Sequence, residues 1–302
     1  MSQETADGAP VLECIPNISE GRDQSVVVRV LEAVRGLPGV TLLDYSSDAD
    51  HNRSVITFLG APDAVLDAAV ALCRAAFERI DMRGHAGAHP RIGAVDVVPL
   101  VPVRGLSMDE VVGYAHRLGE RIGALGVPVF YYEHAATTPE RQNLADVRRG
   151  QYEGLAARLD GGERPDAGPA AMNERAGACL VGARPPLIAF NVNLGSPDMA
   201  LARRIADAVR QKTGGYEAVK AMAVELPESG QVQVSMNLTD FTRTPIHRVV
   251  ETIRFEAARS GVPIIGCELI GLAPLAAFEE VVRHYLQIPG FSSAQIVESH
   301  LL

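Results

Sequence analysis

The spacing of hydrophobic residues predicts a chain built of both helices and strands. Apolar residues recur every three or four positions over residues 24–35 and 62–80, which predicts two helices, the first of them capped by Asp23. Short apolar runs at residues 40–45 and 53–60 have the length and the flanking turns of strands. We expect these two strands to form an antiparallel pair joined by a seven-residue loop.

The same order of elements recurs in the two halves of the chain. The first half reads β-α-β-β-α-β up to the apolar run that follows residue 93, and the second half repeats this order between residues 186 and 275. The sequence therefore predicts an α+β protein of two ferredoxin-like (split β-α-β) modules with mixed or antiparallel sheets. A ligand cleft is expected between the modules.

A Gly/Pro-rich stretch over residues 161–177 separates the two halves. Residues 107–158, which read as helix, strand and polar helical turns, precede this stretch and extend the first half. We therefore expect a disordered tail over residues 1–10, an N-terminal subdomain over 11–178 and a C-terminal subdomain over 179–302.

Composition and charge exclude several classes of function. The net charge of −9 opposes nonspecific binding to nucleic acid, and the chain has no apolar run long enough to span a membrane and no signal peptide. The four cysteines lie far apart and predict neither a zinc site nor a disulfide framework. We expect a cytoplasmic protein.

Residues 81–99 form the stretch richest in side chains that could take part in a reaction. It reads D-M-R-G-H-A-G-A-H-P-R-I-G-A-V-D-V-V-P. Its glycines, and the proline after His89, argue against a helix and predict a loop that leads into a buried strand. A histidine and arginines at such a junction suit a catalytic base and an anion site, although a solvated surface loop would read the same way. His89 is the stronger candidate for the base, and His85 is expected to support it.

Metal and nucleotide chemistry find little support in the sequence. The two histidines have the spacing of a helical metal pair, but the loop removes the helix that would aim both at one ion. D-A-D-H-N (residues 48–52) begins like a calcium loop, yet Arg53 and Leu59 stand where glycine and glutamate are required. No phosphate-binding or dinucleotide motif is present. We expect no metal.

Polar residues at strand ends are further candidates for binding. Asp44, Asp48 and Asp50 could orient an imidazole or bind an amine, or could equally be turn residues. Three asparagines at the ends of predicted strands could contact amide-like edges of a ligand, or again complete turns. They are Asn17, Asn191 and Asn193.

Several segments together resemble the glutamate formimidoyltransferase family, in its stand-alone form without a cyclodeaminase domain. The matching segments are C-I-P-N-I-S-E-G-R, D-A-D-H-N-R-S-V, I-D-M-R-G-H-A-G-A-H-P-R-I-G-A-V-D-V-V-P, P-D-A-G-P and L-I-A-F-N-V-N-L. The resemblance implies transfer of a formimino group from N-formimino-L-glutamate to N5 of tetrahydrofolate, which acts as co-substrate with or without a polyglutamate tail. The products would be 5-formimidoyltetrahydrofolate and L-glutamate, in histidine degradation. The family also implies a homodimer.

The resemblance assigns roles residue by residue. The histidine of its H-P-R-x-G motif is His89, the family's catalytic base. Ser46 stands where the family has a carboxylate, so Asp48 or Asp50 is expected to stabilise developing charge. The family's folate-contacting loop corresponds to Gly168, Pro169, Ala170, Ala171, Met172, Asn173, Glu174, Arg175, Ala176 and Gly177.

Both substrates carry carboxylates, so arginines are expected to hold them. Arg91 ranks first among the candidates, which also include Arg53, Arg83 and Arg184. Two other functions remain open at this point: cyclisation of 5-formyltetrahydrofolate with ATP, as by a cyclo-ligase-type folate enzyme, and binding of folate or another small ligand without turnover.

Overall fold

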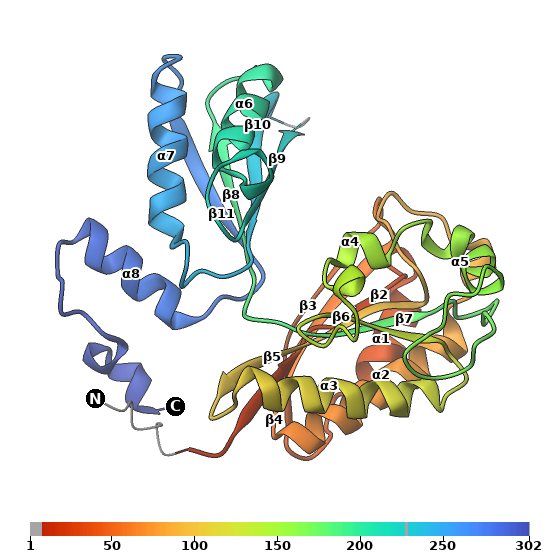
Figure 1. Cartoon of the computed structure of the whole chain (residues 1–302). Helices are drawn as coiled ribbons and strands as arrows, with labels where there is room; N and C mark the ends of the chain where they lie inside the picture. Colours follow the sequence, from red (N-terminus) through yellow and green to blue (C-terminus); the bar gives the residue numbers. More distant parts are fainter. Residues whose placement is uncertain (1–7, 227–228, 302) are drawn as a thin grey trace. The chain divides into compact units, whose positions relative to one another are not determined.

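The computed structural model describes residues 8–226 and 229–301, and the chain divides into two compact units (Figure 1). Unit 1 runs to Arg184, and unit 2 begins at Pro185. Each unit contains one β-sheet with helices, so the architecture is mixed α/β and agrees with the expected α+β class. Residues 1–7 of the expected disordered tail lie outside the described residues.

The sheet of unit 1 contains the first seven strands. They are β1 (Val11–Cys14), β2 (Asn17–Ile18), β3 (Val40–Asp48), β4 (Arg53–Gly60), β5 (Val95–Arg104), β6 (Val129–Glu133) and β7 (Cys179–Ala183). Strands β1 and β2 both pair antiparallel with β4 and β5, β3 pairs with β4, and β7 then joins β5 to β6 through parallel pairing. The Gly/Pro-rich stretch over 161–177 therefore precedes a strand that belongs to this sheet.

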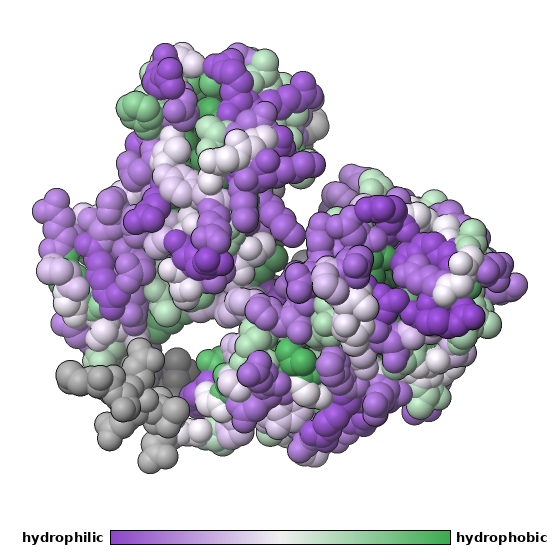
Figure 2. Space-filling model, in the orientation of Figure 1, coloured by the Kyte–Doolittle hydropathy of each residue, from purple (hydrophilic) through white to green (hydrophobic). Residues whose placement is uncertain are grey.

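Helices cover both faces of this sheet. They are α1 (Gln24–Glu32), α2 (Pro62–Arg79), α3 (Met108–Gly123), α4 (Leu144–Val147) and α5 (Gln151–Asp160), with short 3₁₀ helices at η1 (Met82–Gly84) and η2 (Pro139–Arg141). Helices α1, α2 and α3 pack together against one face, and α4 and α5 cover the other face beside β5, β6 and β7 (Figure 1). Polar residues dominate the surface over α4 and α5 (Figure 2).

Unit 2 contains a four-stranded antiparallel sheet in the order β11-β8-β10-β9. Its elements are β8 (Ile188–Leu194), α6 (Met199–Val209), η3 (Gln211–Thr213), β9 (Val219–Leu226), β10 (Gln231–Leu238), α7 (Ile246–Ala258), β11 (Ile264–Ile270), α8 (Leu275–Tyr285), η4 (Ser293–Gln295) and η5 (Val297–Leu301). Helices α6 and α7 pack on one face, where Val192, Val234 and Ile253 are fully buried.

Both units follow the element order that the sequence predicts. In unit 1, the short strands β1 and β2 both lie between β4 and β5, and β3 pairs with the other edge of β4. In unit 2, β10 lies between β9 and β8, and β11 lies on the other side of β8. The two β-α-β-β-α-β segments therefore arrange their strands in the same order.

Helix caps predicted from the sequence are present, whereas one loop length was wrong. The Asp23 carboxylate accepts hydrogen bonds from the backbone N–H groups of Ser25 and Val26, as expected of an N-cap. The expected seven-residue loop between the first two paired strands is shorter, because β3 continues to Asp48 and β4 begins at Arg53. Since β3 is an exposed edge strand, polar residues continue its pairing and hydrophobicity does not mark its end.

No helix in the described part of the chain is long and apolar enough to cross a bilayer.

The capping box of α3 offers a test of the fold of unit 1. Ser107 accepts a hydrogen bond from the Glu110 backbone N–H at 3.3 Å, and the Glu110 carboxylate accepts one from the Ser107 backbone N–H at 2.8 Å. We expect Ser107→Ala to lower the free energy of unfolding by about 1 kcal/mol, whereas Ser107→Thr retains the cap. Urea unfolding measures both variants, and equal stability of Ser107→Ala and wild type would contradict the cap.

Candidate active site

The candidate active site forms where two loops of unit 1 meet. One is the histidine loop, residues 85–94, which leads from η1 into β5. The other is the hairpin loop, residues 49–52, between β3 and β4. Side chains from both loops and from neighbouring segments line a narrow recess, called here the histidine recess. Its lining residues are Ile18, Ser19, His51, Asn52, Arg53, His85, His89, Arg91 and Asp96.

Asn52 joins three segments of the chain at this recess. Its side-chain oxygen accepts a hydrogen bond from the Gly21 backbone N–H at 3.0 Å, and its Nδ2 donates to the Ala86 carbonyl at 3.1 Å. Asn52 is buried and adopts a positive φ of 49°, a conformation that asparagine tolerates better than most residues. One side chain therefore links the β2–α1 turn, the hairpin loop and the histidine loop.

Gly87 lets the two loops approach each other. A Cβ atom at this position would lie 2.3 Å from the His51 carbonyl oxygen and 3.0 Å from the Asn52 Cβ. The neighbouring Ala88 backbone N–H donates to the Asp50 carbonyl at 3.2 Å. The glycine of H-A-G-A-H is thus required by close packing of backbone against backbone.

His89 is a neutral imidazole in the free protein. Burial, followed by the positive charges of Arg53 and Arg148, lowers the pKa of His89 from its ordinary 6.5 to about 3. The ring of His51 lies in an edge-on arrangement with that of His89, with centroids 6.2 Å apart. A neutral imidazole can accept a proton, so His89 is available as a base.

Asp48 orients His51 and has no direct hydrogen bond to His89 in the described structure. The Asp48 carboxylate accepts the His51 backbone N–H at 2.8 Å and lies 2.8 Å from His51 Nδ1. These two interactions, the backbone one first, lower the pKa of Asp48. Sequence reasoning did not select His51, although it belongs to the D-A-D-H-N segment that pointed to Asp48.

Two arginines and one aspartate determine the charge beside His89. The Asp96 carboxylate is fully buried, which raises its pKa, and it accepts a hydrogen bond from Arg148 Nη2 at 2.5 Å. In the described part of the chain, the buried Nε atoms of Arg53 and Arg148 have no hydrogen-bond partner. Burial also lowers the pKa of Arg53. Of these two arginines, Arg53 lines the recess, and its unsatisfied cationic donor favours an anionic ligand.

Arg148 was not selected from the sequence. It lies 52 residues from Asp96, and no local pattern around it indicates the contact.

Arg91 is engaged by protein groups in this structure. Its guanidinium forms a two-point contact with the Glu153 carboxylate, at 2.6 and 2.9 Å, and Nη1 also donates to the Gln151 side chain. Its Nε donates to His85 Nδ1 at 3.1 Å. Because Nδ1 accepts, the His85 proton is on Nε2, which donates to the Asn52 carbonyl at 3.1 Å. Burial lowers the pKa of His85, and the hydrogen bond to the Asn52 carbonyl partly offsets this effect.

The loop Gly168–Gly177 lies against the histidine loop. Gly93 and Gly177 form an isolated β-bridge, and the Met82 backbone N–H donates to the Arg175 carbonyl at 2.9 Å. Within the loop, Asn173 Oδ1 accepts the backbone N–H groups of Arg175 and Ala176. The Arg175 guanidinium donates to backbone carbonyls at the end of α2.

The predicted asparagines lie elsewhere. Asn17 is buried in β2, where its Nδ2 donates to the Ile15 carbonyl at 3.0 Å. Asn191 and Asn193 belong to β8 of unit 2, where both donate to the Glu268 carboxylate. The structure thus brings Asp48, His89 and their arginine neighbours together within unit 1, and the two β8 asparagines occupy a separate unit.

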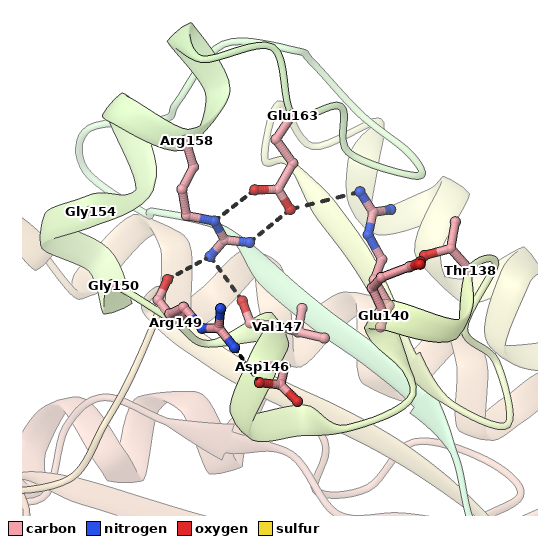
Figure 3. A pocket seen from close by; sticks show the side chains of 10 residues that line it. Thr138, Glu140, Asp146, Val147, Arg149, Gly150, Gly154, Arg158 and Glu163 are labelled. Carbon is pink, nitrogen blue, oxygen red and sulfur yellow. Dashed lines mark hydrogen bonds and ion pairs between the residues drawn. The ribbon is translucent and has the colours of Figure 1, made fainter.

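A larger cavity of about 770 Å³ lies among α4, α5 and adjoining segments (Figure 3). Arg158 forms a two-point contact with Glu163, which also lies 3.8 Å from Arg141, and Arg149 pairs with Asp146. These arginines are neutralised by carboxylates. In the part of the chain that the structure describes, none of the site residues predicted from the sequence lines this cavity.

Among residues 8–226 and 229–301, no group of three or more His, Cys, Asp or Glu side chains is arranged to hold a metal ion. The absence of a metal from the reaction stays a prediction.

Family models match both units. The model of the formiminotransferase domain, N-terminal subdomain, matches residues 11–184, and that of the formiminotransferase domain matches residues 189–299. The chain belongs to the formiminotransferase family. The resemblance inferred from the sequence motifs is confirmed.

Individual relatives extend over almost the whole chain. A glutamate formimidoyltransferase of Streptococcus pyogenes is 48% identical over 97% of this chain and 99% of its own length. One of Thermoplasma acidophilum is 44% identical over 95% of this chain and 96% of its own. The formimidoyltransferase-cyclodeaminase of Sus scrofa is 42% identical over 92% of this chain, but the match covers 52% of that protein. The similarity therefore follows the stand-alone formiminotransferases along their full length.

Two glycines of this formiminotransferase-family chain test how the recess is built. We expect Gly87→Ala to shift the NMR resonances of the His51 and His89 rings, because the new methyl group collides with the His51 carbonyl. Gly84→Ala is the matched control, since no atom lies within 4 Å of its added Cβ. Both rings should keep their resonances in that variant. Unchanged resonances in Gly87→Ala would contradict the close approach of the two loops.

Proposed function

We propose that this chain transfers the formimino group of N-formimino-L-glutamate to N5 of tetrahydrofolate, with His89 as the general acid-base. The products are 5-formimidoyltetrahydrofolate and L-glutamate, in histidine degradation. The observation that carries the proposal is a neutral histidine beside two partly unsatisfied guanidinium groups, in a chain that belongs to the formiminotransferase family.

The reaction needs one proton to move between two nitrogens. N5 of tetrahydrofolate adds to the formimino carbon, forming the new C–N bond, and the bond from that carbon to the glutamate nitrogen then breaks. His89 takes the proton that N5 loses and returns it to the departing glutamate nitrogen. A neutral imidazole can begin this cycle because its ring nitrogen accepts the first proton.

Arg53 and Arg148 are the arginines proposed to hold a substrate carboxylate. Each has a buried Nε without a partner in the described structure, although Arg148 also pairs with Asp96 through Nη2. In Arg91, by contrast, all three guanidinium nitrogens have protein partners. A bound carboxylate would offset the repulsion that these guanidiniums exert on a protonated His89. Substrate binding should therefore raise the pKa of His89 and make it a better base.

Supporting roles follow from the same contacts. We assign to Asp48 the orientation of His51, which in turn lies beside His89. Arg91 positions His85 and the histidine loop. The folate loop Gly168–Gly177 is proposed to contact tetrahydrofolate, a role supported by its bridge to Gly93 next to the recess.

The finer description of the fold also stays a proposal. The shared strand order of the two units supports ferredoxin-like modules. The division into subdomains 11–178 and 179–302, and a ligand cleft between modules, stay predictions.

The direct test is turnover by the purified full chain. We expect N-formimino-L-glutamate and tetrahydrofolate to yield stoichiometric 5-formimidoyltetrahydrofolate and L-glutamate, followed by absorbance and by chromatography. His89→Ala should lower kcat by roughly 10²- to 10⁴-fold, because one positioned acid-base group contributes that much.

His134→Ala is the control, since His134 is an exposed histidine of unit 1 outside the recess. It should turn over at the wild-type rate. A wild-type chain without transfer activity would refute the function, and a His89→Ala variant as fast as wild type would refute the role of His89.

A further inference from the structure

The sheet of unit 2 presents a polar surface on the face opposite α6 and α7. Buried Val232 and Val234 point to the helices, so Gln233 between them points to the opposite face, where it is itself buried. Across the strands, Gln233 lies opposite Asn193, and Asn191 lies opposite Glu268. Neighbouring positions on three strands therefore place these four polar side chains together.

The four side chains form one hydrogen-bonded network, called here the Glu268 network. The Glu268 carboxylate accepts from Asn193 Nδ2 at 3.0 Å, from Gln233 Nε2 at 2.9 Å and from Asn191 Nδ2 at 3.4 Å. Gln233 Nε2 also donates to Asn193 Oδ1 at 2.8 Å. Three amides from two strands thus fix the orientation of one carboxylate.

Glu268 is ionised and retains capacity for a ligand. The hydrogen bonds from Asn193, and then from Asn191 and Gln233, lower the pKa of Glu268 despite some desolvation. Each of these donors in the described structure is a neutral amide, so none neutralises the negative charge. A carboxylate offers about four acceptor sites, and the three amides occupy three of them, so one site remains on the exposed Glu268 side chain.

The surroundings leave room for a flat group. Gly266 lies opposite Asn193, and a Cβ added there would meet only Asn193 Nδ2, at 3.9 Å. Met222 and Ile270 are 60% and 51% exposed, at positions of β9 and β11 that share the orientation of the network. An oriented carboxylate beside open space and exposed apolar side chains suits a planar ligand with N–H donors on its edge.

We propose that Glu268, oriented by Asn191, Asn193 and Gln233, accepts one N–H of an amidine-type N–C–N edge. The remaining acceptor site of Glu268 takes one N–H of such an edge, and the charge of the carboxylate strengthens this hydrogen bond. The inference rests on the proposed function, whose two substrates both carry this chemistry. In tetrahydrofolate it is N3–H with the 2-amino group of the pterin ring, and in the donor substrate it is the formimino group.

The test uses Glu268→Gln in the full chain. Isothermal titration calorimetry with 5-formyltetrahydrofolate and, separately, with N-formimino-L-glutamate gives the Kd of each compound that carries the N–C–N group. Steady-state kinetics give KM and kcat. We expect Kd for one of the two compounds, and KM for the matching substrate (tetrahydrofolate or N-formimino-L-glutamate), to rise about 10- to 100-fold, while kcat falls much less. A rise for the folate assigns the edge to the pterin, and a rise for formiminoglutamate assigns it to the formimino group.

Two further variants separate binding from structure. Glu268→Asp keeps the charge and should recover part of the lost affinity, whereas Glu225→Gln removes an exposed carboxylate on the helix-facing side of the same sheet and should bind both compounds as wild type does. Unchanged Kd values for both compounds in Glu268→Gln would overturn the proposal, as would losses shared by Glu225→Gln. If the wild type lacks transfer activity, the proposed function fails, and the two titrations still decide the role of Glu268.

Discussion

The hydrogen bonds of Asn52 are the interaction on which the candidate active site depends. Its amide connects Gly21 to Ala86, segments that lie far apart in the sequence. Buried backbone groups need partners, and Asn52 supplies two of them where no strand can. With Gly87 allowing backbone contact, this anchor fixes His51 and His89 against each other.

The second constraint is electrostatic. Burial and two neighbouring guanidiniums disfavour the charged form of His89, so the free protein keeps an imidazole that is a weak base. The same guanidiniums attract a substrate carboxylate, and its binding would relieve the repulsion. Under our proposal, substrate binding and the basicity of His89 are therefore coupled through Arg53 and Arg148, and the base becomes effective when substrate is present.

Sequence patterns identified much of this arrangement and missed specific parts of it. His85, His89 and Arg91 stand within one motif whose glycines and proline predict a loop, so their proximity followed from the local sequence. Arg148 was missed because its contact with Asp96 spans 52 residues and leaves no periodic signal.

Other differences have equally physical causes. Residues 161–177 look like a linker in the sequence because glycine and proline disfavour regular elements, but their backbone pairs within unit 1, as at Gly177 and Gly93. Glu268 was missed because its three amide partners come from strands that meet only in the folded sheet. Cross-strand neighbours of this kind cannot be found from spacing along one strand.

The protonation of His89 tests the account most directly. NMR of chain labelled with ¹³C at histidine Cε1, with the His89 signal assigned by its loss in His89→Gln, would follow pH with and without N-formimino-L-glutamate. We expect His89 to stay neutral well below the ordinary histidine pKa of 6.5 in the free chain, and its pKa to rise when the substrate binds. A free-chain pKa near 6.5 that the substrate leaves unchanged would contradict this expectation.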